Sequence, residues 1–332
     1  MAQESYDVVG IGNAIVDIIA RCDEGFLTKH DLDKGIMRLI DADEAAKLYE
    51  AMGPAIERSG GSVANSIAGL ASFGAKCGFI GRVAADQFGG IFRHDIRSLG
   101  IAYTTEPADD GAPTARCLVL VTPDGERTMN TFLGVSVDFT PADIDADLIG
   151  NAKIVCLEGY LFDKDAAKSA FREAAGLAKA AGAKVALTLS DPFCVDRHRA
   201  DFLKLVKEDA DIVFANEKEI TTLYEVNSFA EAADAALQDC ELAVLTRSEA
   251  GSVIVSGGET IEVPADPVSK VVDATGAGDL YAAGFLFGLA RGLPVAVCGK
   301  LGSLAAAEVI SHIGARPETS LAKLAGARGL LD

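Results

Sequence analysis

The sequence predicts an α/β fold, a three-layer sandwich with a mostly parallel central sheet and a small β-sheet lid. Short apolar, β-branched runs alternate with amphipathic helical stretches along most of the 332 residues. Such alternation builds a parallel sheet with helices on both faces. A hairpin pattern interrupts it once, and an antiparallel hairpin inserted among βα units usually stands apart from the main sheet. This hairpin indicates the lid.

The N-terminal elements follow from local patterns. A first strand is expected at residues 7–12, and the mixed alternation of 18–40 suits short strands better than a helix. A Gly-rich turn at 59–65 leads into an apolar helix at 66–73, which Gly74 ends. A strand at 76–81 then precedes a further helical unit that begins near 81–89.

The middle of the chain carries the lid hairpin. Residues 115–122 and 127–132 alternate around the turn Pro-Asp-Gly-Glu, which predicts two antiparallel strands. We assign the lid to segments 14–40 and 102–137, and the remainder of the single chain 1–332 to one large α/β domain. No repeat, low-complexity segment or linker divides the chain.

The C-terminal half returns to βα alternation. Strands are expected near 154–157, 185–189, 212–214, 243–246 and 252–255, with helices such as 164–181 and 228–237 between them. Two β-branched residues, Val271 and Val272, suggest the end of a further buried strand, followed by a helix at 280–291. In such sheets, ligands bind at the carboxyl ends of the strands.

Composition limits the function classes. The formal net charge of −19 argues against nucleic acid and anionic membranes as partners, and no apolar run reaches membrane-spanning length. Residues 1–7 lack signal-peptide features, so a cytoplasmic location is expected. The seven scattered cysteines and four isolated histidines form no disulfide or zinc pattern. The chain also lacks the P-loop and dinucleotide glycine motifs.

Residues 273–279, Asp-Ala-Thr-Gly-Ala-Gly-Asp, are the most informative stretch. A Gly-rich turn opening a helix collects unpaired N–H groups and the positive end of the helix dipole, which attract phosphate. Asp279 at this point acts either as a helix N-cap or as a base that removes a proton from a hydroxyl. In the second reading the turn, Gly276, Ala277 and Gly278, neutralises a phosphoryl group during transfer.

Other polar residues suit the same chemistry, each with a structural alternative. The partners of Asn13 and Asp17 are either a ligand's hydroxyl groups or backbone amides. Asn216 and Glu219 either organise Mg²⁺, directly or through water, or simply cap an acidic helix. Arg127 either contacts the transferred phosphate as the lid closes or is a solvated surface side chain.

Together these motifs resemble the ribokinase-like, phosphofructokinase-B family of carbohydrate and nucleoside kinases, over essentially the whole chain. The resemblance depends chiefly on residues 273–279, with support from 60–65, 81–89 and 216–219. Within the family, the sequence is most similar to adenosine kinases. The resemblance implies ATP and Mg²⁺ as cofactors, a nucleoside or sugar acceptor, and a monomer or homodimer.

The resemblance also implies roles for individual residues. Substrate binding would involve Asn13, Asp17, Met37, Gly60, Gly61, Asn65, Leu133 and Tyr160. Nucleotide binding would involve Asn216, Glu219, Thr246, Arg247, Gly251 and Gly314. Asp273 and Thr275 resemble the family's monovalent-cation site, which often takes K⁺. Thr246-Arg247-Ser248 departs from the family's Thr-x-Gly, so Arg247 either meets a phosphate or points to solvent.

The acceptor follows least directly from the sequence. Apolar residues that would contact a flat base are Ile15, Met37, Leu133, Tyr160 and Phe193, although the same residues would also serve to pack the lid. Few polar groups are available to a free sugar in the lid segments, which favours adenosine and its conversion to AMP. Ribose, fructose, inosine and guanosine remain alternatives, and a non-catalytic nucleotide-binding regulator is a further one.

Overall fold

The computed structural model describes residues 5–331. The prediction that residues 1–7 lack signal-peptide features therefore falls mostly outside the described residues. The larger sheet has the strand order β13-β12-β11-β10-β9-β8-β1-β5, and its strands from β5 to β11 pair in parallel. The strands, in chain order, are β1 (Tyr6–Ile11), β5 (Cys77–Ile80), β8 (Ala152–Glu158), β9 (Lys184–Thr188), β10 (Ile212–Asn216), β11 (Leu242–Thr246), β12 (Ser252–Ser256) and β13 (Glu259–Val263).

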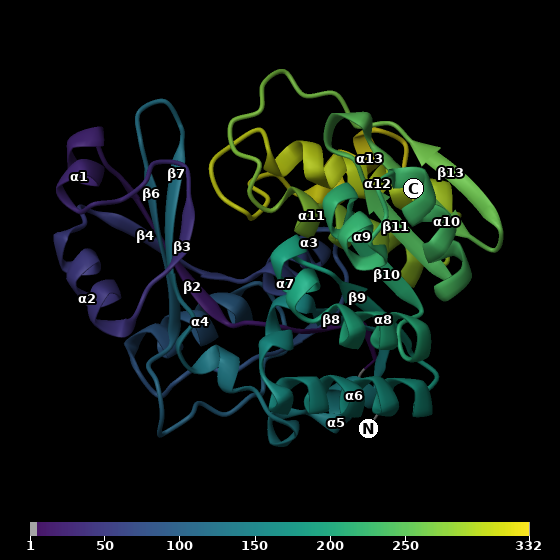
Figure 1. Cartoon of the computed structure of the whole chain (residues 1–332), viewed down its shortest axis with the longest axis horizontal. Helices are drawn as coiled ribbons and strands as arrows, with labels where there is room; N and C mark the ends of the chain where they lie inside the picture. Colours follow the sequence, from purple (N-terminus) through teal and green to yellow (C-terminus); the bar gives the residue numbers. More distant parts are fainter. Residues whose placement is uncertain (1–4, 332) are drawn as a thin grey trace.

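Helices cover both faces of this sheet, which confirms the predicted sandwich (Figure 1). Side chains of β1 alternate between the two cores, because Val8 packs on one face and Val9 on the other. One face carries α3 (Ser62–Ser72), α11 (Ala277–Ala290), α12 (Val295–Val309) and α13 (Leu321–Ala327). The other carries α5 (Ala146–Gly150), α6 (Asp165–Ala180), α7 (Pro192–Arg197), α8 (Arg199–Glu208), α9 (Glu217–Tyr224) and α10 (Phe229–Asp239).

A smaller sheet of order β3-β7-β6-β2-β4 stands to the side of the larger one (Figure 1). Its strands are β2 (Ile15–Arg21), β3 (Met37–Leu39), β4 (Ala55–Gly60), β6 (Ala115–Val121) and β7 (Arg127–Phe132), accompanied by α1 (Glu24–Lys29), α2 (Ala42–Ala51) and α4 (Gln87–Ser98). The hairpin β6–β7 is therefore confirmed. On one face of the smaller sheet, Cys117, Val119 and Val121 pack against Ile313 of the C-terminal segment.

Several local predictions are wrong, for identifiable reasons. Segment 18–40 holds the predicted short strands, as the end of β2 and β3, but the unpredicted helix α1 lies between them. The carboxylate of Asp23 caps this helix by accepting from the Phe26 N–H at 2.8 Å. Helix α3 begins at Ser62 rather than 66, and β4 was not predicted. Val271 and Val272 form no strand, and Val271 is exposed.

Candidate active site

The Gly-rich turn opens α11 as predicted. Gly276 is the N-cap with φ 80°, a left-handed conformation, and a Cβ there would lie 2.9 Å from Ala315 Cα. The N–H of Ala277 makes a long bond, 3.3 Å, to the carbonyl of Ala274. Among residues 5–331, no acceptor is found for the N–H groups of Gly278 and Asp279. Two of the first amides of α11 are thus free to hold an anion.

Asp279 lies in the first turn of α11 and is held by two side chains of α3. Its Oδ1 accepts from Ser62 Oγ at 2.6 Å, and its Oδ2 accepts from Asn65 Nδ2 at 3.1 Å. Burial raises the pKa of Asp279 to about 6, while these two hydrogen bonds and the charge of Arg316 act in the lowering direction. A carboxylate with such a pKa is a stronger base than an exposed aspartate.

A cavity of about 770 Å³ opens beside Asp279 at the carboxyl ends of β9, β10 and β11. This volume is within the range of nucleotide-sized sites. Of the predicted residues, its walls include Asn216, Glu219, Thr246, Gly251, Ala277, Gly278 and Asp279. The turn at 276–278, the candidate base Asp279 and most of the predicted nucleotide residues therefore share one cavity.

Asn216 and Glu219 form a capping box at the start of α9. Asn216 Oδ1 accepts from the Glu219 N–H at 2.9 Å, and Glu219 accepts from both the N–H and the Nδ2 of Asn216. Burial raises the pKa of Glu219 to about 7, and the charges of Asp191 and Asp279 add to this. The capping alternative is thus present, yet both residues also face the cavity.

The acidic groups around the cavity fit Mg²⁺ that arrives with a nucleotide. In the described part of the chain, no cluster of three or more His, Cys, Asp or Glu side chains could hold a metal by itself. Mg²⁺ typically keeps several waters and binds through one or two carboxylates plus phosphate oxygens. Glu219 is placed for such a contact, since a cation would relieve the repulsion from Asp191 and Asp279.

The smaller sheet contributes Asp17. Strand alternation puts Asp17 on the face of β2 that also carries Ile15 and Ile19, next to Cys117 of β6. Burial raises the pKa of Asp17 to about 6, against the charges of Arg316 and Arg127. No hydrogen bond to Asp17 is found among residues 5–331. Its carboxylate is therefore available to a ligand's hydroxyl groups.

Gly60 and Gly61 lie where the chain passes from β4 into α3. A Cβ on Gly60 would come within 2.3 Å of Asp17 Oδ2, so any other residue here would displace this carboxylate. Gly61 has φ 106°, and a Cβ there would lie 2.1 Å from the carbonyl oxygen of Asn13. These glycines let α3 approach β2, which brings Asn65 beside Asp279.

Asn13 has protein partners that the sequence did not indicate. Its Nδ2 donates to Glu158 Oε1 at 2.7 Å, and its Oδ1 accepts from Ser136 Oγ at 2.9 Å. Glu158 also accepts from the N–H groups of Asn13 and Val63, and burial raises its pKa to about 7. Asn13 therefore ties β1 and α3 together through Glu158, instead of relying on a ligand.

Arg127 is buried and paired with Asp273, so it is not a solvated surface side chain. Its Nε lies 3.0 Å from Asp273 Oδ2, and both side chains are less than a tenth exposed. The Asp273 carboxylate also accepts from the N–H groups of Thr275, at 3.0 Å, and Gly314, at 2.9 Å. This carboxylate is already neutralised, which does not fit an added monovalent cation, and we derive no step through K⁺.

Two predicted nucleotide residues lie off the cavity wall. The Arg247 guanidinium stacks over Phe229 at 4.6 Å and faces Glu217 at 3.8 Å, while its neighbour Ser248 lines the cavity instead. Gly314 donates to Asp273, as described above. Arg247 is thus not free in solvent, since Phe229 and Glu217 contact its guanidinium, and its contact with a phosphate stays a prediction.

Three of the five predicted base-contacting residues are exposed, whereas Leu133 is partly buried and Ile15 packs within the smaller sheet. Met37, Tyr160 and Phe193 are 46%, 38% and 75% exposed, so they do not serve mainly to pack the lid. Leu133 is partly buried and its carbonyl accepts from Ser136 Oγ at 2.6 Å.

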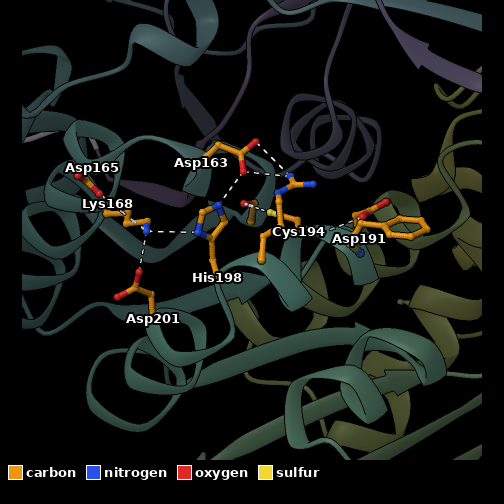
Figure 2. A network of polar contacts seen from close by, with 10 residues as sticks. Asp163, Asp165, Lys168, Asp191, Cys194, His198 and Asp201 are labelled. Atoms are coloured by element: carbon orange, nitrogen blue, oxygen red, sulfur yellow. Dashed lines mark hydrogen bonds and ion pairs between the residues drawn. The ribbon is translucent and has the colours of Figure 1, made fainter.

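The turn that carries Tyr160, η3 (Gly159–Asp163), is anchored by a polar network. Figure 2 shows Asp163 beside His198, with Lys168 joining His198 to Asp201, and Asp163 also accepts from Arg197. Asp163 lies 3.0 Å from Arg197 and 2.8 Å from His198, and Lys168 lies 2.6 Å from Asp201. This network fixes the turn to α7 and α8.

Sequence reasoning missed Ser62, Glu158 and Arg316. Ser62 follows the glycine pair directly, so its position at a helix N-terminus was a usable signal. Glu158 is an acidic residue that directly follows the apolar run of residues 154–157 in β8, which marks a buried charge in need of partners. Arg316 had no local signal, because it lies in an irregular segment beyond α12.

Comparisons with known proteins agree with this geometry. Residues 37–321 match the pfkB family of carbohydrate kinases. A 5-dehydro-2-deoxygluconokinase of Listeria monocytogenes is 30% identical, covering 76% of this chain and 80% of its own. The crystal structure of adenosine kinase from Sinorhizobium meliloti is 52% identical with a TM-score of 0.90, covering 98% of this chain and all of its own. A probable sugar kinase from Rhizobium etli is 49% identical with a TM-score of 0.91, and each chain covers the other completely.

Within residues 5–331, no helix is both long and apolar enough to span a membrane.

Proposed function

The chain belongs to the pfkB family of carbohydrate kinases, and from this premise we propose that it transfers the γ-phosphoryl group of ATP to the primary hydroxyl of adenosine, giving AMP. It is an ATP-dependent phosphotransferase with a ribokinase-like fold, as the motifs around residues 273–279 implied. The finer proposal concerns the acceptor and the roles of individual residues.

The observation that carries the proposal is the placement of Asp279 beside free amides on the wall of the cavity. In the proposed reaction, Asp279 accepts the proton of the acceptor hydroxyl as the oxygen attacks the γ-phosphorus in line. The N–H groups of Gly278 and Asp279 stabilise charge on the transferred group. Asp17 and Asn65 hold the ribose hydroxyls. Mg²⁺, bound with the nucleotide near Glu219, would neutralise phosphate charge.

We propose that the smaller sheet acts as a lid and that Arg127 assists transfer from it. Arg127 Nη2 is buried and has no hydrogen-bond partner in the described part of the chain. An unpaired buried donor is costly, and a phosphate oxygen would satisfy it. Closure of this sheet over the acceptor would also exclude water from the reacting groups.

Adenosine is favoured over a free sugar by the apolar side chains that remain exposed. Met37, Tyr160 and Phe193 offer surface for a purine base. The adenosine kinase from Sinorhizobium meliloti, similar over nearly its whole length, supports the same choice. A sugar acceptor is the second candidate, because the Listeria relative is a 5-dehydro-2-deoxygluconokinase.

An acceptor panel tests the proposal. The purified protein with Mg²⁺–ATP should release ADP faster with adenosine than with inosine, guanosine, ribose, fructose or 5-dehydro-2-deoxygluconate. The product with adenosine should be AMP by chromatography. A higher kcat/KM for any free sugar would contradict the nucleoside assignment while leaving the kinase family intact.

A further inference from the structure

Arg316 reaches the candidate catalytic region from the segment that follows α12. Its Nε donates to Asn65 Oδ1 at 2.9 Å. Its Nη2 donates to the carbonyl oxygen of Ser59 at 2.5 Å and lies 3.1 Å from Ser59 Oγ. Three atoms from two elements, β4 and α3, therefore fix one guanidinium.

The guanidinium is itself positioned by a carboxylate behind it. Asp95 Oδ2 accepts from the N–H and the Oγ of Ser59, at 2.8 and 2.5 Å. Ser59 Oγ therefore donates to Asp95 and can accept from Arg316. The chain of contacts runs Asp95, Ser59, Arg316, Asn65, Asp279 without a break.

This chain determines which way the Asn65 amide points. Its Oδ1 faces the Arg316 donor, so its Nδ2 faces Asp279 Oδ2 at 3.1 Å. The opposite amide orientation would set the NH₂ group against a guanidinium and the carbonyl oxygen against a carboxylate, and both contacts repel. Without Arg316, the Asn65 amide loses the constraint that keeps a donor on Asp279.

The positive charge of Arg316 also favours the ionised form of Asp279. The groups that act electrostatically with Asp279 are Asp17, Cys156, Glu158, Tyr160, Glu219 and Arg316. Arg316 is the cation among them, and it faces Asp95, Asp17 and Arg58 as well. Burial lowers the pKa of Arg316 to about 10, which still leaves it charged at neutral pH.

We propose that Arg316 is a positioning residue for phosphoryl transfer, which orients Asn65 against Asp279 and keeps the Asp279 carboxylate ionised and aimed at the acceptor hydroxyl. The inference rests on the proposed role of Asp279 as base. It does not depend on which acceptor is used, because the hydroxyl is the only part of the acceptor that enters it.

The test compares Arg316→Met and Arg316→Lys with the wild type, using Mg²⁺–ATP and whichever acceptor the panel selects. Arg316→Met should lower kcat about 10- to 100-fold, the scale expected when a reacting group is displaced by about 1 Å. The acidic limb of its kcat–pH profile should move up by about one pH unit, because Asp279 loses a neighbouring positive charge. Arg316→Lys, which keeps the charge, should leave that limb in place.

Arg172→Met is the matched control, because Arg172 is about half exposed on α6 and its nearest carboxylate, Asp201, lies 3.9 Å away. It should leave both kcat and the pH profile unchanged. Adding Asn65→Ala to Arg316→Met should cost little beyond the larger single effect, since residues that act as one unit are not additive.

An unchanged acidic limb in a folded Arg316→Met protein would overturn the proposal, as would a loss confined to the acceptor KM, which would make Arg316 a binding residue. Strictly additive losses would overturn it too. Should Arg316→Met fail to fold, the Lys variant decides, since a limb displaced in spite of the retained charge contradicts the role. A wild type inactive toward adenosine contradicts the acceptor assignment alone.

Discussion

Replacing Asp279 with asparagine should abolish most of the turnover and make the fold more stable. The two effects have one cause. Burial holds the pKa of Asp279 near 6, above its ordinary 3.8, so the ionised form costs folding free energy at neutral pH. The contribution of Asp279 to folding stability is fully present below about pH 4, where the carboxyl is protonated. This contribution is lost as the pH rises through about 6 and the folded protein has to hold a buried carboxylate.

The size of the stability gain follows from the same shift. The pKa of Asp279 is raised by roughly two units, from 3.8 to about 6, which corresponds to at most about 3 kcal/mol at about 1.4 kcal/mol per unit. The carboxylate borders an open cavity, so solvent screening reduces this to about 1–2 kcal/mol. The new amide keeps its hydrogen bonds, because its carbonyl can accept from Asn65 and its NH₂ group can donate to Ser62 Oγ. Asp279→Asn should therefore raise Tm by about 1.5–3 °C for a chain of 332 residues.

The loss of turnover should be about 10²- to 10⁴-fold, the contribution of a positioned general base. A coupled ADP-release assay measures it, and calorimetry should show ATP binding unchanged. Asp234→Asn, at an exposed position on the outer helix α10, is the control and should change neither quantity. Turnover within tenfold of the wild type would remove Asp279 from the base role. A lowered Tm would contradict the burial argument instead.

Three further predictions concern the residues around this base. Arg127→Ala should lower kcat more than it raises the acceptor KM, as steady-state kinetics will show, and a change confined to KM would place Arg127 outside the transition state. Replacing K⁺ by Na⁺ in the assay should leave wild-type turnover unchanged, because Asp273 is paired with Arg127; activity that requires K⁺ would show that this pair opens. Gly61→Ala should destabilise the fold by at least about 1–2 kcal/mol, the cost of a strained backbone, because the added Cβ would meet the Asn13 carbonyl. Chemical denaturation measures this loss. Unchanged stability would mean that β4 and α3 can shift apart.

The parts of the site that could be predicted from the sequence are local in the chain. Residues 276–279 are a continuous turn and helix start, so their amides and carboxylate could be placed together without a structure. The contacts that complete the site join distant segments. Ser62 and Asp279 are 217 residues apart, and Asn65 and Arg316 are 251 apart. No periodicity or spacing carries information about such pairs.

In the fold, too, the elements with a local sequence pattern were predicted and those that depend on tertiary contacts were missed. Strong alternation identified the parallel strands and the hairpin, since burial on one or both faces leaves a regular pattern. Strand β4 was missed because its residues 55–58 are exposed or half exposed and mix apolar with charged side chains. Helix α1 was missed because a single cap, Asp23, and the burial of Leu27 decide its conformation against a mixed sequence. Tertiary contacts determined both elements.

Charge explains why the site is built as it is. The chain carries a net charge of −19, and three carboxyls with raised pKa values, Asp17, Glu158 and Glu219, each interact electrostatically with Asp279, whose pKa is raised as well. A triphosphate would be repelled there unless positive potential is supplied locally. The backbone amides of α11 supply part of it without adding a titratable group. Arg127 on the smaller sheet and Arg316 in the C-terminal segment are the candidates to supply the rest, so we expect a competent site to require both segments in place together.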